Sequence, residues 1–151
     1  MAYTLSQFTM EHYDDVYSLW EQCEGIGLSD FNSPENTNVF LLRNPGLSFI
    51  AREKGELVGA VFSGHDGRRG YAYHLALRKN HGNQSLGRQL IEKCISALKL
   101  AGIKSVIFLS LIIMLMVLTF GMLLDGNLAQ TSVLYRKILP ESCMKINENL
   151  I

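Results

Sequence analysis

YAYHLALRKNHGNQSLGRQLIEKCISALKLAG, residues 71–102, is the stretch that decides the fold. Its first seven residues, 71–77, are typical of an apolar strand, and a polar loop rich in small residues follows at 80–85. The next residues predict a helix, because apolar side chains recur at helical spacing: Leu86, Leu90, Cys94, Leu98 and Ala101. Gly102 is a typical helix stop. A strand that enters a helix through a glycine-containing turn directs unpaired N–H groups at one point, which predicts an anion site such as one for pyrophosphate.

The segment HLALRKNHGNQSLGRQL, residues 74–90, resembles the acyl-CoA-binding segment of the GNAT (Gcn5-related) N-acetyltransferases. In that family a strand is followed by Q/R-x-x-G-x-G/A and a helix, and the three motif positions fall here on Gly82, Ser85 and Gly87. Two are off-pattern, because Gly82 lacks a polar side chain and Ser85 replaces a glycine that lets backbone approach phosphate closely. The resemblance continues upstream through GHDGRRGYAYHLAL, residues 64–77, and covers about the first two-thirds of the chain.

The resemblance implies an α/β (α+β) fold with a mixed, mostly antiparallel central sheet flanked by helices. It places an acyl-CoA site at the splay between the fourth and fifth strands. We expect one domain at residues 1–139 and a C-terminal tail at 140–151. The implied activity is acetyl-CoA-dependent transfer of an acetyl group to an amine of a small molecule or protein. Two other hypotheses are a non-catalytic acyl-CoA-binding domain and a membrane-anchored protein that uses residues 105–124 as its span.

The resemblance also gives the candidate site residues. Acetyl-CoA, as cosubstrate, is expected to contact these residues, largely through their backbone: Leu75, Ala76, Leu77, Gly82, Asn83, Gln84, Ser85, Leu86, Gly87 and Arg88. His74 has a pKa suited to accept the proton of the amine, and Glu24 or Asp30 in the loop 24–31 is an alternative base. Tyr73 is the nearest candidate for the acid by sequence, although core packing is the favoured explanation of this residue. No metal is expected.

Composition narrows the class of partner. Fourteen basic and fourteen acidic residues cancel, and no basic stripe is visible, so a nucleic-acid partner has no electrostatic support. The expected partner is a small-molecule or peptide amine acceptor, and no membrane partner is expected. Cys23, Cys94 and Cys143 are odd in number and far apart, and no apolar N-terminal segment precedes them. We therefore expect a cytoplasmic protein without disulfides. Pairing of edge strands makes a homodimer one further expectation.

The rest of the first hundred residues predicts a strand at 3–8 and a helix capped by Thr9, with its apolar positions at Tyr13, Val16, Tyr17, Trp20 and Cys23. A second helix should begin at Ser33-Pro34-Glu35 and run to about Arg43. Strands at 48–53 and 57–63 form a hairpin. The residues HDGRRG, 65–70, are either a charged hairpin tip or a catalytic cluster.

Residues 104–109 predict a strand parallel to the one at 71–77. The pattern then changes, because residues 105–124 contain no charge. Three interpretations remain open: a core segment, a membrane span, and a stretch at 111–126 read out of codon register. In the shifted frame Met116-Val117 encodes glycine, and Phe120-Gly121 and Asp125-Gly126 each encode Trp or Arg, so the segment can match the last GNAT helix. A final strand is expected at 131–138.

Overall fold

A five-stranded sheet forms the centre of the computed structural model, which describes residues 2–23, 26, 28–81 and 84–108. The strands lie in chain order across the sheet: β1 (Thr4–Gln7), β2 (Phe49–Glu53), β3 (Glu56–His65), β4 (Arg69–Leu77) and β5 (Ser105–Phe108). The first four strands pair antiparallel, and β5 pairs parallel to β4. The predicted mixed, mostly antiparallel sheet is confirmed.

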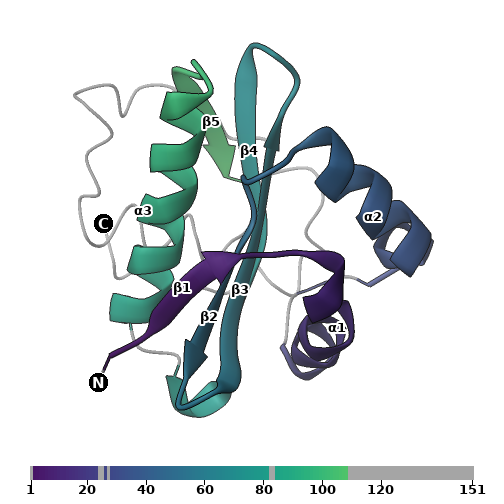
Figure 1. The fold of residues 1–151 in the computed structure, drawn as a ribbon, viewed down its shortest axis with the longest axis vertical. Helices are drawn as coiled ribbons and strands as arrows, with labels where there is room; N and C mark the ends of the chain where they lie inside the picture. Colours follow the sequence, from purple (N-terminus) through teal and green to yellow (C-terminus); the bar gives the residue numbers. More distant parts are fainter. Residues whose placement is uncertain (1, 24–25, 27, 82–83, 109–151) are drawn as a thin grey trace, which may run out of the picture.

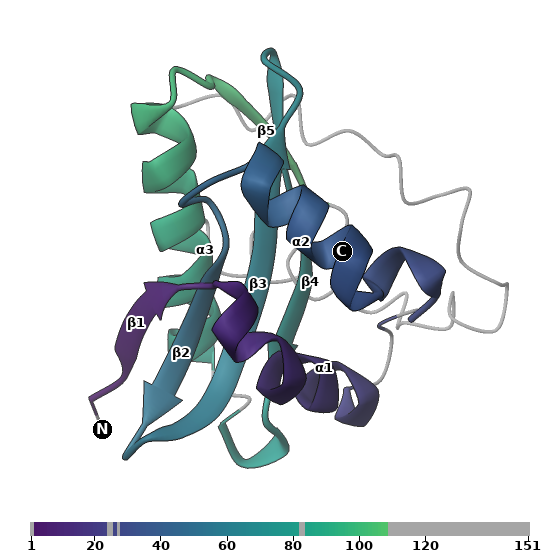
Figure 2. The same ribbon diagram turned by 45° about the vertical axis from the view of Figure 1, so that its right-hand side comes forward.

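Helices cover both faces of the sheet (Figure 1). The face toward α3 (Gln84–Leu100) is opposite to the face that carries α1 (Tyr13–Gln22) and α2 (Pro34–Arg43), as the turned view in Figure 2 also shows. Three short 3-10 helices precede these helices: η1 (Met10–His12), η2 (Asp30–Asn32) and η3 (Lys79–His81). The sheet is therefore the middle of three layers.

The ends of the helices follow from local chemistry. Ser33 caps α2, because its hydroxyl accepts a hydrogen bond from the Asn36 N–H at 3.2 Å, and Pro34 occupies the first turn. Gly102 has a φ of +83° just beyond α3, where an L side chain would be strained. The prediction for α1 extended one residue too far, since the helix ends at Gln22.

The turn between β3 and β4 decides between the two interpretations of residues 65–70. The carboxylate of Asp66 accepts hydrogen bonds from the backbone N–H groups of Arg68 and Arg69, each at 2.8 Å, and from the Tyr71 hydroxyl at 2.9 Å. These bonds hold the pKa of Asp66 at about 2, below its usual range. The carboxylate therefore closes a hairpin tip, which lets β3 and β4 extend beyond their predicted limits.

Apolar clusters on the two faces of the sheet hold the layers together. Under α3, buried residues of the sheet, including Val61, Ala72 and Leu75, pack against Leu86, Leu90 and their neighbours on the helix. On the other face, Trp20 of α1 packs with Phe62 and Ala76. Burial of apolar surface on both faces fixes the helices against the sheet.

The uncharged segment begins inside the sheet. Residues Ser105–Phe108 pair with Arg69–Ala72, which confirms the predicted parallel strand. The three interpretations of residues 111–126, the strand predicted at 131–138 and the tail at 140–151 all lie outside the described residues. Within the part of the chain that the structure describes, no helix has the length and apolar character needed to cross a membrane.

Candidate active site

A bulge in β4 places two consecutive side chains on the same face of the sheet. Tyr73 lies opposite Phe62 and Ala76 lies opposite Ala60, so two residues of β4 face one residue of β3. The extra residue is accommodated at His74, whose φ is +52°. Histidine is one of the non-glycine residues that occupy this region more readily. Bulges redirect side chains, and here Tyr73 and His74 both turn toward α1 and α2.

The bulge forms one wall of a pocket of about 230 Å³, called here the His74 pocket. Residues from four parts of the chain line it: Ser29, Phe31, Asn32, Thr37, Phe40, Phe62, Tyr73 and His74. The described pairing of β5 with β4 reaches Ala72, and the pocket residues Tyr73 and His74 follow directly after it in β4.

Asn32 fixes the ring of His74. Its side-chain amide donates a hydrogen bond to Nε2 of His74 at 3.0 Å, while its Oδ1 accepts the Ser29 N–H at 3.2 Å. The backbone carbonyl of Asn32 in turn accepts hydrogen bonds from the Tyr13 hydroxyl at 2.7 Å and the Thr37 hydroxyl at 3.4 Å. With Nε2 as the acceptor, the neutral ring carries its proton on Nδ1. Burial lowers the pKa of His74, which favours this neutral form.

Tyr73 contributes mainly apolar surface. Its ring centroid lies 5.7 Å from those of Phe40 and Phe62, and 5.3 Å from that of His74. Burial raises the pKa of the Tyr73 hydroxyl, which makes it a weaker proton donor than an exposed tyrosine. The packing interpretation of Tyr73 is therefore supported by its contacts.

The predicted anion site lies past the other end of β4. After Leu77, the chain turns through η3 and enters α3 at Gln84, so the N-terminus of a long helix follows the strand directly. His81 of η3 is tied to the sheet, because its Nε2 lies 2.6 Å from a carboxylate oxygen of Glu53 on β2. This contact fixes the start of the connection between β4 and α3.

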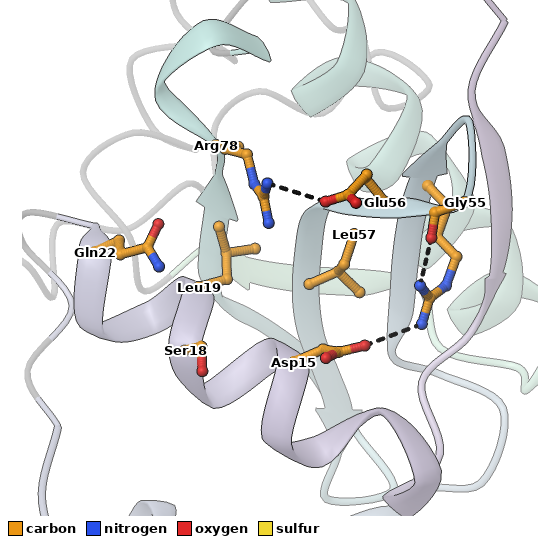
Figure 3. Close-up of a pocket in the computed structure, with 9 residues that line it drawn as sticks. Asp15, Ser18, Leu19, Gln22, Gly55, Glu56, Leu57 and Arg78 are labelled. Carbon is orange, nitrogen blue, oxygen red and sulfur yellow. Dashed lines mark hydrogen bonds and ion pairs between the residues drawn. The ribbon is translucent and has the colours of Figure 1, made fainter.

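A second pocket, of about 210 Å³, lies between α1 and the hairpin of β2 and β3 (Figure 3). Arg78 reaches Glu56 across it at 3.3 Å, and Arg52 pairs with Asp15 at 3.3 Å. Each guanidinium therefore already has a carboxylate partner. Partly exposed ion pairs of this kind contribute little to the stability of the fold. Because both guanidinium groups of this second pocket are already paired, the His74 pocket is the stronger candidate for chemistry.

Comparison with known proteins identifies the family. The model of the "Acetyltransferase (GNAT) family" matches residues 11–112, a range that includes β4, α3 and the whole His74 pocket. The chain belongs to the GNAT acetyltransferase family. An acetyltransferase of Sodalis glossinidius is 32% identical over 87 residues, and one of Pectobacterium atrosepticum is 33% identical over 87 residues. Both alignments cover 57% of this GNAT chain and 60% of the relative.

Solved structures share the fold of this GNAT domain. The PaiA N-acetyltransferase of Thermoplasma acidophilum, in complex with coenzyme A, has a TM-score of 0.56 at 14% identity, over 68% of this chain and 75% of that one. The N-acetylglutamate synthase of Neisseria gonorrhoeae, complexed with coenzyme A and N-acetyl-glutamate, has a TM-score of 0.61 at 18% identity, over 73% and 26% of the two chains. At these identities the likeness concerns the fold.

The structure brings together only part of the predicted site. His74 and Tyr73 lie in one pocket, whereas Glu24, Gly82 and Asn83 are outside the described residues. Asp30 is exposed on η2 and does not line the His74 pocket. Leu75 of β4 and Leu86 of α3 are buried between the sheet and that helix, so their side chains cannot contact a ligand. Ala76 packs toward α1, Leu77 is half-buried, and Ser85 and Arg88 are exposed on the first turns of α3.

Sequence reasoning missed the residues that complete the pocket. Asn32, Phe40 and Phe62 come from three elements that no motif connects. The loop 24–31, which holds the alternative bases Glu24 and Asp30, contributes Ser29 and Phe31 to the lining of the pocket. Among the described residues, no group of three His, Cys, Asp or Glu side chains is placed to hold a metal ion.

Proposed function

We propose that this protein is an N-acetyltransferase that moves the acetyl group of acetyl-CoA to an amine bound in the His74 pocket. One observation carries the proposal: β4 presents this pocket through Tyr73 and His74, and then leads directly into the N-terminus of α3. The two reactants would thus be held by adjacent parts of one strand. Holding reactants in register is itself a large contribution to catalysis.

Acetyl-CoA would bind along β4 and the start of α3. The backbone of residues 75–77 is proposed to meet the acyl and pantetheine part, and the N-terminal end of α3, where the helix dipole is positive, to meet the pyrophosphate. The exposed side chains of Ser85 and Arg88 flank that turn. Because backbone groups carry these contacts, the two off-pattern residues of the motif are compatible with binding.

The reaction forms a C–N bond between the amine and the acetyl carbon and breaks the C–S bond of the thioester. The proton that leaves the amine is finally taken up by the coenzyme A thiolate. His74 is the proposed relay, since its low pKa keeps it neutral. Its Nε2 can accept a proton only when the hydrogen bond from the Asn32 amide to this nitrogen is broken. Loss of the acidic limb of the pH–rate profile in His74→Asn would support this role, and an unchanged profile would exclude it.

Titration calorimetry with acetyl-CoA tests the proposed binding mode. Ser85→Asp adds a negative charge at the start of α3, and Ser96→Asp makes the same change far from the proposed site on the same helix. We expect Ser85→Asp to weaken acetyl-CoA binding at least about tenfold, because it repels the pyrophosphate. Ser96→Asp should leave it within about twofold. Equal effects, or no binding by a folded wild-type protein at millimolar acetyl-CoA, would contradict the proposal.

A second candidate function is acyl-CoA binding without catalysis. It is favoured by Ser85, which stands where the motif has glycine. Tight binding of acetyl-CoA without release of thiol in the presence of many amines would support this candidate.

Location in the cytoplasm and a homodimer formed through sheet edges stay predictions, which fractionation and light scattering can check.

A further inference from the structure

We infer that the His74 pocket selects an acceptor whose amine is attached to a flat, uncharged, apolar group, such as an arylalkyl monoamine. This inference rests on the proposed acetyl transfer and specifies its substrate. Half of the residues that line the pocket are aromatic: Phe31, Phe40, Phe62 and Tyr73. The centroids of Phe40 and Phe62 lie 4.9 Å apart, and Tyr73 lies 5.7 Å from each of them. These rings offer the contact that another flat ring prefers.

Phe31 forms the outer edge of this aromatic wall. Its side chain is 85% exposed although it belongs to one of the largest apolar residue types. By contrast, Phe62 at the base of the pocket is 4% exposed. Phe31 therefore has apolar surface that a bound molecule would cover, while the inner rings are already packed.

The described lining of the pocket has no side chain of Asp, Glu, Lys or Arg to balance a second charge on the acceptor. The amide of Asn32 and the hydroxyl of Thr37 are committed to internal hydrogen bonds. Burying an unpaired charge is costly, so a diamine or an amino acid carboxylate would be rejected, whereas a monoamine can lose its proton and enter as the neutral nucleophile.

The size of the pocket points to one ring. Its volume of about 230 Å³ is below the roughly 300–1,000 Å³ of sites for drug-sized ligands. The amine would lie toward His74 and β4, where the new C–N bond forms, and the ring would lie among the phenylalanines. A free arylalkylamine and the N-terminal aromatic residue of a peptide both have this combination of an amine and a nearby aromatic ring.

Fluorescence of Trp20 can report binding without acetyl-CoA. Trp20 is the single tryptophan of the chain, and its ring centroid lies 5.4 Å from that of His74 and 4.9 Å from that of Phe62. The probes are 2-phenylethylamine, the dipeptide amide Phe-Ala-NH2, 1,5-diaminopentane and glutamate. We expect saturable changes with one or both aromatic probes, and the tighter of the two identifies a free amine or a peptide N-terminus as the source. Tighter saturation by the diamine or glutamate, or no saturation by either aromatic probe, would overturn the inference.

Two variants sharpen the test. Phe31→Ala should weaken binding of the preferred aromatic probe about two- to tenfold. Val39→Ala is the control, because Val39 is 63% exposed on α2 and does not line the pocket. Equal effects of the two variants would contradict the inference. Thiol release from acetyl-CoA then separates the two proposals: aromatic probes that bind without being acetylated leave the pocket chemistry standing and refute the proposed transfer.

Discussion

Replacing Gly64 with alanine should break the hydrogen bonds that Asn44, at the end of α2, makes with β3 and with its own helix. A Cβ atom built on Gly64 would lie 2.7, 2.8 and 2.9 Å from Cγ, Oδ1 and Nδ2 of Asn44. That amide has no room to absorb the change, since Asn44 is 5% exposed and makes two hydrogen bonds. Its Oδ1 accepts the His65 N–H at 3.0 Å, and its Nδ2 donates to the Phe40 carbonyl at 3.2 Å. We expect both bonds to break.

The cost follows from those two bonds. Each buried group left without its partner costs about 1–3 kcal/mol, and loss of glycine freedom in the unfolded chain returns about 0.4–1 kcal/mol. Gly64→Ala should therefore lower the free energy of unfolding by about 1–6 kcal/mol, measured by urea denaturation. In an Asn44→Ala background the clashing atoms are gone, so the same change should cost less than about 0.5 kcal/mol. Additive effects of the two substitutions would refute the reasoning.

Two further predictions concern groups whose pKa is shifted by burial. The pKa of His74 is lowered in the folded protein, so between that pKa and its unfolded value of about 6.5 the unfolded chain binds the extra proton. Stability should thus fall as the pH drops below about 6.5, and His74→Asn, which suits a positive φ, should reduce this loss between pH 7 and 5; equal losses would contradict the assignment. Burial raises the pKa of Cys94 to about 12, so mass spectrometry should find Cys94 unmodified by iodoacetamide at pH 8 until urea unfolds the protein. Labelling at the same rate in native and unfolded protein would show that the thiol is accessible.

The layers of the fold could be predicted from the sequence, because they depend on short-range patterns. The helical spacing of apolar residues from Leu86 to Leu98 predicted the buried face of α3, and Ser33-Pro34 predicted where α2 begins. The uncharged segment could not be resolved in the same way. Its first residues pair in β5, and the family match stops at residue 112, next to the predicted start of the shifted register at Leu111.

The sequence by itself determined the family, the strand before α3 and the candidacy of His74 and Tyr73. Only the tertiary structure decided that both side chains point into one pocket. Regular strand alternation would send adjacent residues to opposite faces, and it is the bulge at His74 that turns them to the same side. Asn32 lies 42 residues away in the chain yet donates a hydrogen bond to that ring. Such a contact depends on how α1 and α2 pack on the sheet, which no local pattern of residues specifies.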